Sequence, residues 1–171
     1  PPRGPPARGA GQAASASARG GGAAHAGLFS TAADLAVFAQ MMLDGGTYHG
    51  VRIVSDSTVA LFTRRSAGWR ALGWETCAGG ASCGQHMSER AYGHTGYTGT
   101  SLWIDPDHDL FVIVLSNRVH QEPNGRTPPI AVLADVRADI ADLAELAVDD
   151  GGPTLAMPAT LRADLAIGWS R

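Results

Sequence analysis

The chain has 171 residues, 44% of them hydrophobic, enough for one domain with a single core. Thirteen Lys and Arg residues against sixteen Asp and Glu give a formal charge of −3, so the positive field that binds nucleic acid is missing. The longest apolar run covers only residues 110–115, far short of the ~20 residues that a membrane-spanning helix needs.

The two ends of the chain differ in composition from its middle. Residues 1–22 hold four of the ten prolines and no large apolar residue, which predicts a disordered or linker segment. The chain begins at Pro1 without a signal-like segment, and we therefore expect it to be a piece of a longer protein. Residues 151–171 have only a faint helical period and are treated as a C-terminal tail.

The first ordered elements are expected between residues 31 and 62. Ser30 and Thr31 before Asp34 form a helix-start pattern, and an apolar stripe at helical spacing predicts a helix over 31–44. Residues 47–54 predict a tight hairpin or turn, and Ser55–Phe62 is typical of a short capped helix.

Three strands are expected in the middle of the chain. Residues 71–76 predict a strand that enters a Gly- and Ser-rich loop over 77–89. Tyr97–Ile104 and Leu110–Leu115 predict an antiparallel pair, joined by a Pro- and Asp-rich turn over 105–109. Because 110–115 is apolar on both faces, we expect a central strand that is covered on both sides.

A long helix is expected near the C-terminus, at about 129–147. Its apolar residues recur every three or four positions with Asp and Arg between them, which predicts that this stripe packs on the sheet. The stripe consists of Leu133, Val136, Ile140, Leu143 and Ala147.

The segment 92–106 is the most informative part of the sequence. Glycines at the start of a strand often mark a place where a ligand or another backbone approaches closely. His94-Thr95-Gly96, followed by Thr98-Gly99 and a Trp-Ile-Asp-Pro turn at 103–106, closely resembles the Lys/His-Thr-Gly strand of the serine β-lactamase and penicillin-binding protein superfamily. The loop and helix start at 24–35 and the Leu-Gly-Trp strand at 72–74 resemble the same family.

The resemblance is nearest to class C-like serine hydrolases and runs from about 20 to about 118. It implies an α+β fold, an antiparallel sheet with packed helices, of which this chain forms a part over residues 23–150. The helices at 31–44 and 129–147 are expected to pack on the sheet, with other helices of the family covering the opposite face. No cofactor and no metal ion are expected for this chemistry.

The family's site residues can be carried over at four positions. His94 matches the Lys/His donor that holds the substrate's carboxylate or carbonyl, and Thr95 matches the hydroxyl that hydrogen-bonds the substrate. Gly96 matches the position that lets the substrate lie against the strand edge, and the N–H of Tyr97 matches an oxyanion-hole donor. The alternative for His94 is a strand-end histidine with a structural hydrogen bond.

The family's nucleophile motif is missing from this chain. All thirteen basic residues are Arg, so no Ser-x-x-Lys motif exists here, and no Tyr-x-Asn motif exists either. We therefore expect the C-terminal part of a serine hydrolase that acts on an ester, a D-amino-acid peptide or a β-lactam outside the cytoplasm. The missing N-terminal part of the domain would then be its partner. The competing hypothesis is a non-catalytic module that binds a peptidoglycan peptide.

Other polar residues carry weaker hypotheses. The sequence leaves three possibilities open for Cys77 and Cys83: a disulfide, two free thiols, or a zinc site with His86 and His25. Arg64, Arg65 and Arg70 either attract an anionic substrate or form a solvated surface. His25 either faces the cleft or caps a loop. Alternating Asp105, Asp107 and Asp109 resemble some calcium loops, but the following Glu is missing, and a hairpin turn is expected.

Overall fold

A computed structural model describes residues 28–79, 82–120 and 129–148 of the chain. The predicted linker at 1–22, the C-terminal tail and His25 lie outside these residues, and the domain boundaries stay predictions. No helix in the described ranges is long and apolar enough to cross a bilayer.

The N-terminal elements form where local signals predict them. Helix α2 (Ala32–Leu43) starts at Thr31, whose hydroxyl oxygen accepts from the Asp34 N–H at 3.1 Å. The hairpin β1 (Thr47–Tyr48) and β2 (Val51–Arg52) follows. Ser55 then caps helix α3 (Asp56–Thr63) by accepting from the Thr58 N–H at 3.1 Å. All three predictions are confirmed, because each rests on contacts within a few residues.

An antiparallel four-stranded sheet forms the middle of the structure. Its strands are β3 (Glu75–Thr76), β4 (Tyr92–Thr95), β5 (Ser101–Asp105) and β6 (Leu110–Val114), in the spatial order β3-β4-β5-β6. The α+β class is confirmed. The strand expected at 71–76 is shorter, because only its last two residues pair with β4.

The strand expected over 97–104 is wrong in its first half. Tyr92–Thr95 form a strand of their own, and a tight turn over 96–100 separates it from β5. The Gly96 N–H donates to the Thr100 carbonyl at 2.7 Å, and the Gly99 N–H donates to the Gly96 carbonyl at 3.1 Å. Gly99 has φ +127°, a conformation that side chains rarely allow. His94 therefore lies in β4, before the turn, and not at the head of β5.

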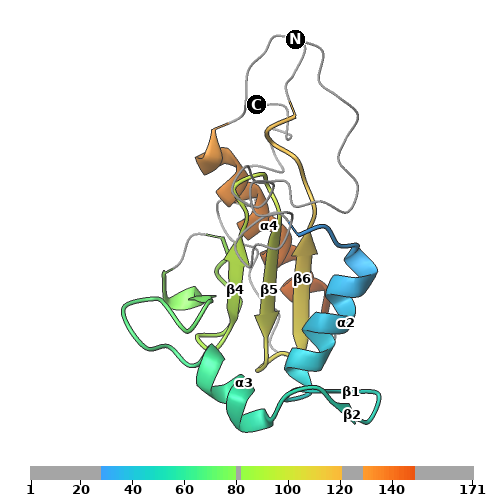
Figure 1. The fold of residues 1–171 in the computed structure, drawn as a ribbon. Coiled ribbons are helices and arrows are strands. Elements are labelled where there is room, and N and C mark those ends of the chain that lie inside the picture. Colours follow the sequence, from blue (N-terminus) through green and yellow to red (C-terminus); the bar gives the residue numbers. More distant parts are fainter. Residues whose placement is uncertain (1–27, 80–81, 121–128, 149–171) are drawn as a thin grey trace, which may run out of the picture. The chain divides into compact units, whose positions relative to one another are not determined.

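The prediction that β6 is covered on both faces is confirmed, but its central position is not. Helix α2 covers one face with Ala39 and Met42, and α4 (Ile130–Val148) covers the other with Ala141 (Figure 1). The two helices thus lie on opposite faces of the sheet, and the expectation that both pack on the same face is wrong. Among the described strands, β6 forms hydrogen bonds only with β5, so it lies at the edge of this four-stranded sheet.

Helix α4 forms where the sequence predicts it, but it buries a different face. Leu143 is exposed, and only Ile140 of the expected stripe packs against the core with Trp103 and Val112. The most buried side chains of α4 are largely charged: Arg137, Asp139, Asp142 and Glu145, beside Ala141. Apolar spacing alone does not reveal this face, because its burial depends on polar partners in other segments.

Three of these charged side chains bind three different turns. Arg137 binds the carbonyls of Gly96 and Thr100, at 2.9 and 2.7 Å. Asp142 accepts the N–H groups of Gln85 and His86, at 2.6 and 3.0 Å. Glu145 pairs at 2.9 Å with His108, in the turn between β5 and β6. Buried charges are tolerated when they are paired in this way.

The charges around His108 influence one another. Burial raises the pKa of the Glu145 carboxyl, and the hydrogen bond and charge of His108 oppose that effect without cancelling it. Burial lowers the pKa of His108, but Glu145, Asp105 and Asp107 outweigh it and raise this pKa overall. The pKa values of both groups therefore lie above their ordinary values.

Cys77 and Cys83 are joined by a disulfide, which decides between the three interpretations of these residues. A bonded pair offers no thiolate for zinc. Cys83 is buried against Met87 and Trp103, so the bridge connects the short 3₁₀ helix η1 (Cys77–Gly79) to the hydrophobic cluster between the sheet and α4.

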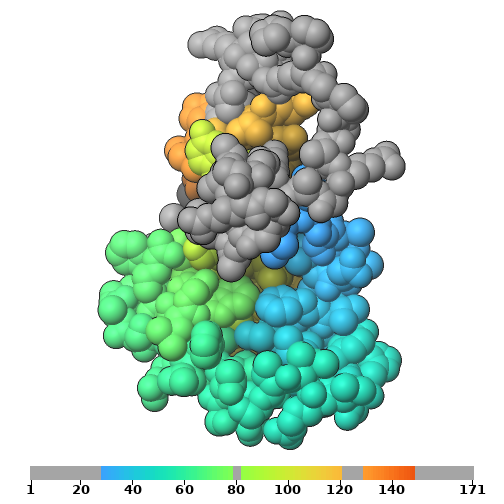
Figure 2. Space-filling model, viewed as in Figure 1, coloured from blue at the N-terminus to red at the C-terminus, as the bar shows by residue number. Residues whose placement is uncertain are grey.

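Large apolar side chains stay exposed on the segment from β2 to the loop before β3. This segment is part of the teal and green surface in Figure 2, and its exposed residues are Val51, Ile53, Leu61, Phe62, Trp69 and Leu72. Such a concentration is typical of a surface that another segment or protein covers.

The contact between Asp142 and the loop at 84–86 predicts a difference between two glycines. Gly84 has φ +77°, and an added Cβ would collide with the Asp142 carboxylate. Gly73 has φ +85°, and nothing lies within 4 Å of its Cβ position. Both Ala variants carry backbone strain of about 1 kcal/mol, and Gly84→Ala adds about 1–3 kcal/mol of overpacking. Urea unfolding of both variants measures the difference, and equal destabilisation would contradict the prediction.

Candidate functional site

The predicted site residues occupy the end of β4 and the turn after it. On one side, His94 pairs with Leu102 and Thr95 pairs with Ser101 of β5. On the other side, the ladder with β3 stops at Gly93. From His94 onward, no strand of the described ranges covers this edge of β4. An extended ligand can add to an open strand edge by backbone hydrogen bonding.

Two partners hold the ring of His94. Its Nδ1 lies 2.9 Å from the Thr95 carbonyl, and its Nε2 lies 3.4 Å from Nη1 of Arg70. A guanidinium can only donate, so Nε2 accepts and the proton lies on Nδ1, where it is donated to the carbonyl. The contacts therefore fit the tautomer with its proton on Nδ1.

Arg70 brings a positive charge to the same edge. Its Nη2 lies 3.1 Å from the carboxylate of Glu75, and half of the Arg70 side chain is exposed. Glu75 pairs with Gly93 in the β3–β4 ladder, so β3 places Arg70 beside His94. The sequence hypothesis grouped Arg70 with Arg64 and Arg65 and did not connect it with His94.

The turn after the strand is held from inside by Arg137. This side chain is 3% exposed, and one of its nitrogens donates to the carbonyls at both ends of the turn, Gly96 and Thr100. Burial and the charge of Arg118 lower the pKa of the guanidinium, which stays charged in proteins nonetheless. An added Cβ on Gly96 would collide with the Thr100 side chain, so the turn admits only glycine without rearrangement.

Tyr97 lies in this turn with its ring exposed. The guanidinium of Arg118 stacks 4.4 Å from the ring centroid, and Nε of Arg118 donates to the Tyr97 carbonyl at 2.8 Å. The backbone at Tyr97 is thus held by a neighbour outside the turn. The oxyanion role of its N–H stays a prediction, as do the substrate contacts of His94, Thr95 and Gly96.

Sequence reasoning missed Arg137 entirely. The signal available was a single arginine inside a helix whose other charges are acidic. Its partners are backbone carbonyls some 40 residues away, at sequence separations of 41 and 37. No residue pattern encodes such a contact.

The weaker candidates lie elsewhere. Arg64 and Arg65 line a surface pocket of about 340 Å³ with Arg90 and Glu89, and His94 does not line it. Asp105 accepts from Ser88 and from the Asp107 N–H. The segment 105–109 is a hairpin turn, as expected.

Comparison with known proteins agrees with this geometry. The sequence model of a family described as beta-lactamase matches residues 1–137. This chain belongs to the beta-lactamase family. The match covers the strand with His94, Thr95 and Gly96 and extends to Arg137 of α4.

Individual relatives are similar over shorter stretches. Proteins named putative D-alanyl-D-alanine carboxypeptidase, from Salmonella paratyphi B and Salmonella newport, are 44% identical over 108 residues. These residues make up 59% of this chain and 24% of each relative, so the matched region spans about a quarter of the relatives' length.

A solved structure shows a similar fold. The crystal structure of a beta-lactamase from Mycobacterium bovis matches with a TM-score of 0.54 and 26% sequence identity. The match covers 74% of this chain and 45% of the other. The fold described above is therefore that of a beta-lactamase part.

The buried contact of Arg137 predicts a local effect of its removal. Arg137→Met keeps the length and apolar stem but removes both hydrogen bonds to the turn, each worth about 1.5–3 kcal/mol when the donor is charged. We expect a loss of about 2–4 kcal/mol and much faster amide exchange at Gly96 and Gly99, measured by NMR. Arg52→Met, on the exposed strand β2, is the matched control. Unchanged exchange in the turn would show that Arg137 does not hold it.

Proposed function

We propose that this chain forms the substrate-strand side of a serine hydrolase that transfers an acyl group from a D-alanyl peptide or a related ester or β-lactam. The open edge of β4 beside the His94 and Arg70 pair carries the proposal. A serine supplied from outside this lysine-free chain acts as nucleophile. The names of the relatives favour a D-alanyl-D-alanine peptide among these substrates.

The reaction proceeds in two acyl transfers. The serine oxygen attacks the substrate carbonyl while its proton passes to a general base, and the leaving amine or alkoxide departs with a proton. Water then attacks the acyl-enzyme ester and releases the acid and the serine. In both steps the carbonyl oxygen becomes negative, and the N–H of Tyr97 donates to it.

The residues of the strand edge bind and orient the substrate. Its peptide lies along the edge of β4 beyond Gly93, where Gly96 lets it approach closely and the Thr95 hydroxyl donates to it. The terminal carboxylate of a D-alanyl peptide lies near Arg70, whose exposed guanidinium is suited to pair with it. His94, oriented by Thr95 and Arg70, offers Nε2 as an acceptor at this edge.

Two further features support a partial domain outside the cytoplasm. The exposed apolar segment around α3 offers a surface that the remaining part of such a domain covers. The Cys77–Cys83 disulfide is typical of proteins in an oxidising compartment.

The second candidate is a module that binds a peptidoglycan peptide at the same open edge of β4 without cleaving it. The coding sequence around this chain distinguishes the two. A Ser-x-x-Lys motif elsewhere in the same protein supports the enzyme, together with covalent labelling of the whole protein by a fluorescent penicillin. Peptide binding by a whole protein that has no such motif and takes no label supports the module.

His94 is the residue whose replacement tests the enzyme directly. His94→Gln keeps a donor but cannot take up a proton or accept at the same atom, so we expect turnover in the whole protein to fall about 10- to 1000-fold. His94→Lys restores the residue of the Lys-Thr-Gly relatives and should retain more activity than Gln. Because His94 is exposed, melting temperatures should change little.

The control for this experiment is His120→Gln, an exposed histidine outside the strand edge. Activity is measured as hydrolysis of an activated ester. Parental rates in both His94 variants would show that this histidine is structural.

Arg70 should affect the choice of substrate more than the chemistry. Arg70→Gln removes the charge that pairs with a terminal carboxylate, so we expect KM for a D-alanyl-D-alanine peptide to rise about 10-fold, or about 1.4 kcal/mol. Hydrolysis of a neutral ester should stay near the parental rate. Arg52→Gln serves as the control, and an equal effect on peptide and ester would argue against carboxylate recognition.

A further inference from the structure

A second cluster of polar side chains lies at the other end of β5. Asp105 is the last residue of β5. The first residue of β5, Ser101, pairs with Thr95, so the cluster lies four residues along the strand from the His-Thr-Gly turn. Its other members are His108, from the turn after β5, and Glu145, from α4. No step of the proposed hydrolysis uses these residues.

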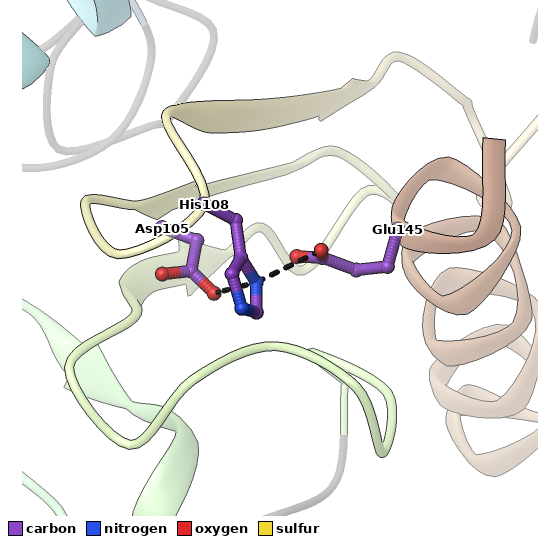
Figure 3. A group of neighbouring side chains, drawn as sticks. All are labelled: Asp105, His108 and Glu145. Carbon is purple, nitrogen blue, oxygen red and sulfur yellow. Dashed lines mark ion pairs between the residues drawn. The ribbon is translucent and has the colours of Figure 1, made fainter. Parts of the chain in front are cut away.

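The three side chains converge on one point (Figure 3). Nδ1 of His108 lies 3.2 Å from Oδ2 of Asp105 and 2.9 Å from Oε2 of Glu145. One nitrogen and two carboxylate oxygens thus lie within 4.8 Å of one another. In a tetrahedral zinc site with bonds of about 2.0–2.1 Å, ligand atoms lie about 3.3–3.4 Å apart. The two nitrogen–oxygen distances are already close to that value, and the two carboxylate oxygens must move toward each other to reach it.

The burial of the cluster adds an independent observation. The side chains of Asp105 and Glu145 are 0% and 4% exposed, and Oε1 of Glu145 is buried without a hydrogen-bond partner. A buried carboxylate oxygen normally has a partner. Two carboxylates also converge on a single imidazole nitrogen, and a divalent cation can bind all three groups at once.

The surroundings of the cluster meet two other requirements of a metal site. Ser88 donates to Asp105 from its N–H at 2.6 Å and from its hydroxyl at 2.7 Å, and these two hydrogen bonds fix the orientation of the carboxylate. The side chain of His108 is 42% exposed, so an ion can enter from solvent.

We propose that Asp105, His108 and Glu145 bind a zinc-type divalent ion that fastens the β5–β6 turn to helix α4. The ion replaces the proton on Nδ1 of His108, which leaves to solvent, and a water molecule fills the fourth position. An imidazole with two carboxylates selects Zn²⁺ over Mg²⁺ and Ca²⁺, which prefer oxygen ligands alone. The site is structural, because it lies at the opposite end of β5 from the proposed substrate edge.

The test is a titration of the full chain with metal salts after treatment with EDTA. Isothermal titration calorimetry should show one Zn²⁺ bound with a micromolar Kd or tighter, and no comparable binding of Mg²⁺ or Ca²⁺. At free Zn²⁺ about 100 times Kd, the melting temperature should rise by about 5–10 °C.

Variants assign this binding to the cluster. His108→Gln and Glu145→Gln should each weaken Zn²⁺ binding at least about 10-fold, while His120→Gln should bind like the parent. Circular dichroism checks that each variant is folded. If His108→Gln does not fold, Glu145→Gln, which keeps the shape of the side chain, decides whether the cluster binds the ion. Absence of saturable Zn²⁺ binding, or parental binding in the folded variants, would leave a proton-held ion pair only and overturn the proposal.

Discussion

The arrangement of the sheet depends on the charged buried face of helix α4. Arg137 holds the turn after β4, Asp142 holds the loop that follows the disulfide, and Glu145 holds the turn after β5. Arg137 and Asp142 lie 37–57 residues along the chain from the backbone groups that they bind. A helix with an apolar face would bury surface against the sheet, but it could not satisfy carbonyls and N–H groups at three specific places.

This arrangement links stability to the proposed substrate edge of β4. The two carbonyls bound by Arg137 flank the turn that contains Tyr97, whose N–H is the proposed oxyanion donor. A donor must be positioned before charge develops on the substrate, because reorganisation during the reaction costs free energy. The buried guanidinium keeps the turn in one geometry, while Arg118 holds its outer side at the Tyr97 carbonyl. Positioning at this edge thus depends on residues that do not touch the substrate.

The features predicted correctly from sequence rest on local contacts. The start of α2 depends on Thr31 and Asp34, and the start of α3 depends on Ser55 and Thr58, each pair three residues apart. The His-Thr-Gly motif is also local, and it identified the family. The break between β4 and β5 was missed, because the glycines at 96 and 99 fit both a strand start and a turn. Only the pairing of Thr95 with Ser101 decides between them.

The errors about β6 and α4 have a common physical origin. A strand that is apolar on both sides indicates that both faces of its sheet are covered. The hydrogen bonds to neighbouring strands lie in the plane of the sheet, and the side chains do not show how many neighbours a strand has. β6 is therefore buried by α2 and α4 on its faces and still lies at the edge of the sheet that the described strands form. In α4, likewise, helical periodicity measures apolar content, whereas burial of Arg137 and Glu145 follows from partners that the fold brings to them. The burial of charged residues inside an amphipathic pattern is thus predicted least well from sequence. In this chain, such residues of α4 hold the turn at the proposed substrate edge and form part of the proposed metal site.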